Sequence, residues 1–466
     1  MGSLSSAAWA RTASAATPKP ASVVATGGTR FTGLPWQIPK DFLGSCLINW
    51  PNGGFNFSGV LKYGSARMTQ LYEARWSTIE TSPGVYSSAA LAILDSIITA
   101  HRQNGATVLF GVYGVPAFYA NNATANPTYT DAQTEGPWNA LGECAMPDSA
   151  GANYNGTNTG NNSSGLNGLT ALYNFCQMIA TRYNGAGGSW FLANGAALGK
   201  AIAYWEMGNE PHFAYPSGAS VGNGNTTGSG GPGGYFWWDS ANHYVDYCYT
   251  QRQAVKAIDS TILMCNGGFA GNPTGLGKVF LQASGAINTG ITGYATVDAL
   301  ASHWYGLTPE GTVLGAWGSN RGAVNSTGAD SGVMGITYTS TNMAATDSRF
   351  GIANLPYWCT ESGVCEIITD GTTLAWYNAP APFRKRHMKR LLKTLMGQRV
   401  SRWDPWHAED IATPFFSGNW QTDTGGVIAA YNELAVESCG KTLIDGAWIS
   451  GGPVLHQYSD GTMTID

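Results

Sequence analysis

Short apolar runs alternate with longer stretches of helical periodicity from residue 44 onward. In residues 88–103, for example, Leu91, Leu94 and Ile98 recur at the spacing of one helix face. Alternation of strands and helices is typical of a parallel sheet, and eight strands in one such series predict a (β/α)8 barrel. The strands are expected at 45–50, 71–79, 107–113, 201–207, 262–265, 297–305, 356–361 and 400–406. The main helices are expected at 59–73, 88–103, 166–183, 241–258, 381–397 and 426–438.

The chain divides into three parts. Residues 1–35 are rich in Ala, Ser and Thr with scattered Pro, and we interpret them as a flexible tail. Residues 36–440 are expected to form the barrel. Residues 441–466 carry short alternating runs and an Asp-Gly hairpin signal, which predict a small β appendage packed on the barrel. Two polar stretches, 121–165 and 217–234, follow the third and fourth strands and are too long for ordinary connections.

The composition narrows the class of ligand. Only 11% of the 466 residues are charged, whereas aromatic residues make up 12% and glycine is abundant. Such a chain suits uncharged, hydroxylated ligands better than phosphates. The net charge of -5 gives no basic footprint for nucleic acid, and no apolar run approaches the roughly 20 residues of a membrane span. The oligomeric state is left open.

The cysteines and the glycosylation signals bear on the cellular compartment in which the protein is found. There are eight cysteines and no Cys-x-x-Cys pair, so disulfides and free thiols are both open. Cys144, in a polar loop, is the best candidate for pairing, whereas Cys176, Cys248 and Cys265 fall in helix or strand patterns and are expected to be buried thiols. Asn-x-Ser/Thr sequons occur at Asn56, Asn122, Asn155, Asn161, Asn162, Asn225 and Asn325. They favour a secreted or otherwise extracytoplasmic protein.

Two of the expected strands end in an acid. The fourth ends in Trp-Glu-Met-Gly-Asn-Glu-Pro (205–211), and the seventh ends in Thr-Glu-Ser-Gly (360–363). Active sites of such barrels lie at the carboxyl ends of the strands, so Glu210 and Glu361 are expected at the mouth, across from one another. Cleavage of a glycosidic bond needs one carboxyl group to protonate the leaving oxygen and a second to attack the sugar or activate water. The two acids therefore indicate a carbohydrate-active site.

The segment at 205–211 resembles the Asn-Glu-Pro motif of clan A glycoside hydrolases. The resemblance implies that Glu210 is the catalytic acid/base and that Asn209 hydrogen-bonds the sugar 2-hydroxyl. In that clan the nucleophile is a Glu at the end of the seventh strand, which implies this role for Glu361. The resemblance covers roughly residues 44–440 and leaves open two types within the clan, the xylosidase/iduronidase type and the heparanase/β-glucuronidase type.

Three further segments resemble the clan. Ala-Arg-Trp at 74–76 is similar to its second-strand pattern, which implies that Arg75 supports the nucleophile. Ser-His-Trp-Tyr at 302–305 resembles its sixth-strand His-x-Tyr, which implies that His303 and Tyr305 contact nucleophile and substrate. Trp403 and Trp406 are candidates for the eighth-strand tryptophan that lies under the sugar.

The resemblance implies a retaining double displacement on β-glycosidic bonds. Glu361 attacks the anomeric carbon, and Glu210 first protonates the leaving oxygen and then activates water. No cofactor is expected, and the seven histidines contain no His-Glu-x-x-His metal motif. A transglycosylase would share every one of these residues, whereas a non-catalytic carbohydrate-binding barrel would need neither acid. For Glu80 and Glu206, a supporting role in the site and a structural contact both remain open.

Overall fold

The computed structural model describes most of the barrel and its C-terminal sheet. The described residues are 29–31, 33–46, 64–69, 71–116, 118–119, 168–211, 241–269, 273–305, 355–363, 366–369, 372–375, 380–397, 399–405, 426–448 and 453–466. The two long polar stretches, the seven sequons, Cys144 and Trp406 lie outside them. Among the described helices, none combines the length and the apolarity that crossing a membrane requires.

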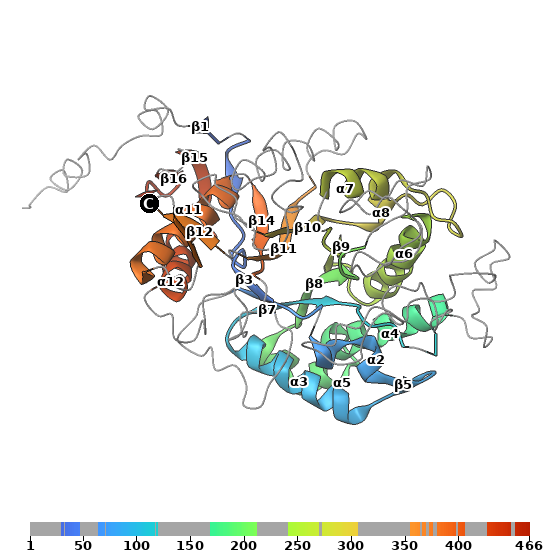
Figure 1. Cartoon of the computed structure of the whole chain (residues 1–466). Helices are drawn as coiled ribbons and strands as arrows, with labels where there is room; N and C mark the ends of the chain where they lie inside the picture. The colour runs from blue at the N-terminus through green and yellow to red at the C-terminus, as the bar shows by residue number, and fades with distance from the viewer. Residues whose placement is uncertain are drawn as a thin grey trace, which may run out of the picture.

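Eight parallel strands form the centre of the molecule (Figure 1). One sheet has the order β3-β4-β7-β8-β9 and the other β10-β11-β14. Parallel bridges from Cys265 to Ala299 and from Phe269 to Ser302 join β9 to β10, and a bridge from Leu43 to Trp403 joins β14 to β3. The two sheets therefore close on each other as an eight-stranded barrel. The strands are β3 Gly44–Cys46, β4 Ser65–Arg67, β7 Thr107–Gly111, β8 Ile202–Met207, β9 Leu263–Asn266, β10 Leu300–Tyr305, β11 Tyr357–Gly363 and β14 Val400–Trp403.

Helices surround these strands (Figure 1). Helix α3 shows why they pack there: Ser87 caps its first turn by accepting from the amide of Ala90, and its buried residues recur at three- and four-residue spacing. The helices are α2 Trp76–Ile79, α3 Ser88–Gln103, α4 Gly168–Asn184, α5 Ser189–Leu198, α6 Ala241–Ile258, α7 Pro273–Gln282, α8 Gly293–Thr296, α11 Ala381–Gly397 and α12 Val427–Glu437, with a 3₁₀ turn η1 at Tyr72–Ala74.

Two apolar layers follow from the alternation of side chains along each strand. On β7, Val108 and Phe110 belong to the large cluster between strands and helices, whereas Leu109 belongs to a small cluster inside the barrel. The inner cluster also contains Cys265, Ala299, Ala301 and Trp358, with Tyr204 packed against it. The barrel is therefore filled by side chains, and buried charged groups such as Arg67, Glu206 and Arg402 accompany this apolar cluster.

The C-terminal segment forms the predicted β appendage. Strands β15 Thr442–Trp448, β16 Val454–Tyr458 and β17 Met463–Ile465 are antiparallel neighbours. Two strands from the N-terminal side of the chain, β1 Thr29–Arg30 and β2 Trp36–Gln37, also pair with β15. The end of the expected tail is thus part of this sheet. Two small antiparallel hairpins complete the described strands: β5 Glu80–Ser82 with β6 Val85–Tyr86, and β12 Glu366–Thr369 with β13 Thr372–Ala375.

The second barrel strand lies earlier than the sequence predicts. We expected a helix over 59–73 and a strand over 71–79, but the strand is β4 Ser65–Arg67, and residues 72–79 form η1 and α2. All three residues of β4 are buried, one of them an arginine. A strand this short, with a buried charge, has neither an apolar run nor an alternating pattern to reveal it.

Candidate active site

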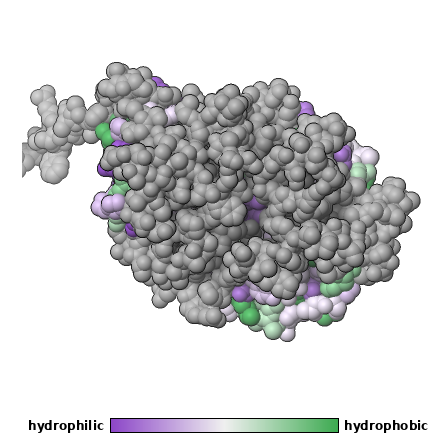
Figure 2. All heavy atoms as spheres, in the orientation of Figure 1, coloured by the Kyte–Doolittle hydropathy of each residue, from purple (hydrophilic) through white to green (hydrophobic). Residues whose placement is uncertain are grey.

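Both expected acids are buried at the carboxyl ends of their strands. Glu210 follows β8 and is 6% exposed, and Glu361 lies in β11 and is 3% exposed. A carboxylate oxygen of each and a ring nitrogen of His303 all lie within 4.8 Å of one another. Figure 2, in the orientation of Figure 1, shows hydrophilic atoms in a recess near the middle of the face turned towards the viewer. The structure thus brings together three residues that the sequence placed on three different strands.

His303 lies between the two carboxylates. Its Nδ1 is 2.8 Å from Oε1 of Glu210 and 3.4 Å from Oε2 of Glu361. Since both neighbours are acceptors, the arrangement favours a proton on Nδ1. Its Nε2 is buried and has no hydrogen-bond partner among the described residues. The ring lies directly over Gly268, where a methyl group would be 2.1 Å from Nε2.

A buried arginine contacts Glu361 and the residue that precedes Glu210. Arg67, the last residue of β4, donates from Nη1 to Oε2 of Glu361 at 3.2 Å and from Nη2 to Oδ1 of Asn209 at 2.7 Å. Its Nε donates to Oε2 of Glu206 at 2.7 Å. Burial by itself would lower the pKa of Arg67, but Glu206 and Glu361 raise it well above its usual value. The guanidinium therefore remains charged next to Glu361.

Arg75 was the wrong arginine for this position. It lies between η1 and α2, and its guanidinium packs over the rings of Tyr72 and Tyr113, at 5.3 Å and 5.6 Å from their centroids. The error follows from the misplaced second strand, because the strand that carries the arginine to the mouth is β4. No spacing or periodicity in the sequence separates Arg67 from Arg75, and only the contacts of Arg67 with Glu206 and Glu361 do so.

The amide of Asn209 is held in one orientation. Its Oδ1 accepts from Arg67, so its Nδ2 points the other way. Asn209 is only 3% exposed, and Nδ2 has no hydrogen-bond partner among the described residues. A buried donor without an acceptor costs free energy. Asn209 therefore offers a donor to a ligand group beside the two acids.

The backbone of the acid-bearing turn is strained. Gly208 has φ 89° and Glu210 has φ 43°, a left-handed conformation that non-glycine residues rarely adopt. Pro211 follows, and a residue before proline is restricted further. The turn also packs closely, since a methyl group on Gly267 would lie 2.4 Å from the carbonyl carbon of Gly208. Such strain is typical of functional sites.

The other expected residues have different positions. Tyr305 is in β10, but its side chain lies outside the described part of the structure. Trp403 is 1% exposed and belongs to the cluster between strands and helices, so its expected place under a sugar was wrong. The reason is alternation: Arg402, one residue earlier, points into the barrel over the rings of Tyr204 and Trp358.

The two open glutamates are resolved by their contacts. Glu80 accepts from Nε1 of Trp76, from the amide of Gly84 and from the hydroxyl of Tyr119, so it holds the turn of the β5–β6 hairpin. Glu206 is fully buried beneath the candidate site and forms the ion pair with Arg67. The sequence pattern left both roles open because spacing alone does not show which groups a buried carboxylate contacts.

The histidine and the two acids are close enough to hold a metal ion. However, Arg67 already places a positive charge on Oε2 of Glu361, and Nδ1 of His303 would have to give up its proton. The donor set therefore suits acid–base chemistry better than metal binding.

The six described cysteines form no disulfide with one another. Cys176, Cys248 and Cys265 are buried thiols, as predicted, and burial raises the pKa of each well above its usual value.

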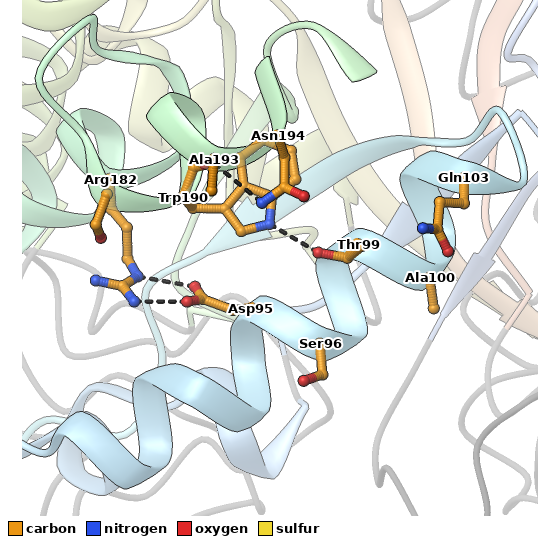
Figure 3. A pocket seen from close by; sticks show the side chains of 10 residues that line it. Asp95, Ser96, Thr99, Ala100, Gln103, Arg182, Trp190, Ala193 and Asn194 are labelled. Atoms are coloured by element: carbon orange, nitrogen blue, oxygen red, sulfur yellow. Dashed lines mark hydrogen bonds and ion pairs between the residues drawn. The ribbon is translucent and has the colours of Figure 1, made fainter. Parts of the chain in front are cut away.

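A second hollow, of about 400 Å³, lies on the outside of the barrel between α3, α4 and α5 (Figure 3). Its polar groups already pair with each other: Arg182 forms two hydrogen bonds to Asp95, and Nε1 of Trp190 donates to Thr99. It therefore offers little to a ligand.

No family model and no curated protein matches this chain. Solved structures do match it. A family 39 glycoside hydrolase from the gut symbiont Bacteroides cellulosilyticus is 15% identical, with 92% of this chain and 69% of that chain covered and a TM-score of 0.50. A glucosidase from Croceicoccus marinus is 15% identical, with 94% and 76% covered and a TM-score of 0.49. Endo-glycoceramidase II from Rhodococcus is 14% identical, with 91% and 86% covered and a TM-score of 0.46. At 15% identity and a TM-score of 0.50, the likeness to the family 39 glycoside hydrolase concerns the fold alone, and it agrees with the predicted (β/α)8 barrel.

Proposed function

We propose that this protein is a retaining glycoside hydrolase that cleaves β-glycosidic bonds in an oligo- or polysaccharide. The observation that carries the proposal is the pair of buried carboxylates, Glu210 and Glu361, with oxygens within 4.8 Å of each other at the barrel mouth. Retaining enzymes have their carboxyl groups about 5 Å apart, whereas inverting enzymes leave about 6.5–9.5 Å for a water molecule.

The contacts support a separate role for each acid. Glu361 is the proposed nucleophile because Arg67 donates to it and so favours its charged form. Glu210 is the proposed acid/base, and its contact with Nδ1 of His303 orients it. Asn209 presents Nδ2 beside them and would donate to the hydroxyl next to the anomeric carbon.

The fold is consistent with this proposal. The family 39 glycoside hydrolase from Bacteroides cellulosilyticus matches the chain with a TM-score of 0.50, and it belongs to a class of enzymes that act on glycosides. The xylosidase/iduronidase and heparanase/β-glucuronidase types remain the two starting points for a substrate screen with aryl β-glycosides. The sequons further lead us to propose an extracytoplasmic location, which secretion assays in the native host would test.

Rescue by azide tests the two roles separately. In Glu361→Gly, azide occupies the place of the nucleophile and attacks a sugar with a good leaving group, so the product is an α-glycosyl azide. In Glu210→Gly, azide attacks the glycosyl-enzyme, so the product is a β-glycosyl azide. Both variants should lose almost all activity without azide. Rescue with the opposite anomers would exchange the two roles, and unchanged activity in either variant would overturn the proposal.

Product analysis separates hydrolysis from transglycosylation. A hydrolase releases free sugar in dilute substrate, whereas a transglycosylase makes longer products under the same conditions. A non-catalytic carbohydrate-binding barrel is disfavoured because binding alone does not require two buried acids. Both Glu210 and Glu361 are buried acids in this chain.

A further inference from the structure

Glu206 does not belong to the reacting pair, yet it contacts Arg67, which in turn contacts Glu361 and Asn209. It lies on β8, four residues before Glu210, and is fully buried. Its Oε2 accepts from Nε of Arg67 and from the hydroxyl of Thr69, and its Oε1 accepts from the amide of Gly268 at 3.3 Å. All three neighbours are donors, which is the environment of an ionised carboxylate.

The guanidinium of Arg67 donates hydrogen bonds from Nε, Nη1 and Nη2, and Glu206 accepts the bond from Nε. Once Nε is held by Glu206, the planar guanidinium can turn in only one way. That orientation places Nη1 against Glu361 and Nη2 against Oδ1 of Asn209. The second contact determines which side of the Asn209 amide faces the site.

The electrostatics of Glu206 agree with this geometry. Burial by itself would raise the pKa of Glu206, but Arg67, His303 and the hydrogen bond from Thr69 lower it overall. Glu206 is therefore charged in the folded protein. Its negative charge offsets part of the positive charge that Arg67 presents to Glu361.

We propose that Glu206 is a positioning residue: it locks the Arg67 guanidinium, and through Arg67 it orients Asn209 so that Nδ2 donates to the substrate hydroxyl beside the anomeric carbon. This inference rests on the proposed glycosidase function. It assigns a task to an acid that touches neither reacting carboxylate directly.

Paired substrates test the inference. The wild type, Glu206→Gln and Asn209→Ala are assayed with an aryl β-glycoside and its 2-deoxy counterpart, which has no hydroxyl to accept from Asn209. In Glu206→Gln, kcat/KM for the hydroxylated substrate should fall about tenfold more than kcat/KM for the 2-deoxy substrate, since one charge-assisted contact is weakened. In the Asn209→Ala background the same substitution should add much less. Equal losses on both substrates would mean a merely structural role and would overturn the inference.

The pH profile gives a second readout. The charged or titratable groups around Arg67 are Glu206, Glu361 and Cys46, together with Asp404 and Cys265. Beyond them lie His303, Glu210 and Arg402, which pairs with Asp404. Removing the charge of Glu206 leaves more of the positive charge of Arg67 to act on Glu361. The acid limb of kcat/KM in Glu206→Gln should therefore move to lower pH. An acid limb that stays in place or moves to higher pH would contradict the inference.

Thr69→Val is the milder companion variant. It removes one hydrogen bond to Glu206 and leaves the carboxylate charge in place. If Glu206→Gln does not fold, Thr69→Val must still show a selective loss on the hydroxylated substrate, and a uniform loss overturns the inference. A wild type that cleaves no member of the substrate panel overturns the proposed function itself. An active wild type with unselective variants overturns only the role of Glu206.

Discussion

An alanine variant is usually more stable than the glycine variant at the same position. The left-handed backbone of Glu210 predicts the opposite order of stability at position 210. We compare Glu210→Gly with Glu210→Ala, and Glu361→Gly with Glu361→Ala as the matched pair. Both native side chains are buried acids of the same site. Glu210 has φ 43°, whereas Glu361 lies within strand β11. Each pair removes the same carboxylate, so the difference within a pair reports mainly on the backbone.

The magnitudes follow from the two conformations. A non-glycine residue in the left-handed region costs about 1–2 kcal/mol, and glycine costs about 0.5–1 kcal/mol in backbone entropy. At position 210, glycine should therefore be more stable than alanine by about 0.5–1 kcal/mol. At position 361, alanine should be more stable by a similar amount. Any benefit from burying the alanine methyl group occurs at both sites and cancels when the two differences are subtracted.

Calorimetry at one scan rate measures the effect. For a chain of this length, 1 kcal/mol corresponds to roughly 1 °C in Tm. The two glycine-minus-alanine differences should have opposite signs and should differ by about 1–2 °C. If alanine is the more stable residue at both positions by the same margin, Glu210 is not held in the left-handed conformation, and the strain argument fails.

Two further predictions concern packing and pH. Gly268→Ala should lower kcat/KM at least about tenfold, because the new methyl group would lie 2.1 Å from Nε2 of His303. In the control Gly187→Ala the methyl group meets no atom within 4 Å, and activity should be unchanged; equal effects would contradict the role of Gly268. Burial, together with Lys393, lowers the pKa of His456 to about 3. The unfolded chain therefore binds the proton first, and up to about 4 kcal/mol of stability present above pH 6.5 is lost as the pH falls towards 3. His456→Gln should flatten the dependence of the unfolding free energy on pH in this window, and an unchanged slope would count against the assignment.

The elements with strong local periodicity were predictable from the sequence. The helices expected at 88–103, 241–258 and 381–397 have the same bounds as α3, α6 and α11. The strand expected at 201–207 is β8 Ile202–Met207. In these segments the apolar face is long enough to show its period, so the pattern and the packing agree. The pairing of β1 with β15 was not predictable, because two residues carry no periodic signal.

The two acids of the candidate site could be predicted from the sequence, whereas the buried arginine that pairs with Glu361 could not. Glu210 and Glu361 could be found because each follows an apolar strand. The arginine beside Glu361 could not, since Arg67 and Arg75 are the same residue type in neighbouring segments, and only contacts with β8 and β11 distinguish them.

A buried guanidinium is costly unless its donors are satisfied. Arg67 is fully buried and donates to Glu206, Glu361 and Asn209. The barrel can bury this charge only because two strand ends supply acceptors. Conversely, Arg67 favours the charged form of Glu206 and places its positive charge against Glu361. The acids and the arginine therefore form one unit that no single segment of the sequence specifies. A substitution of any one of these residues should change the charge and orientation of the others more than it changes the stability of the barrel.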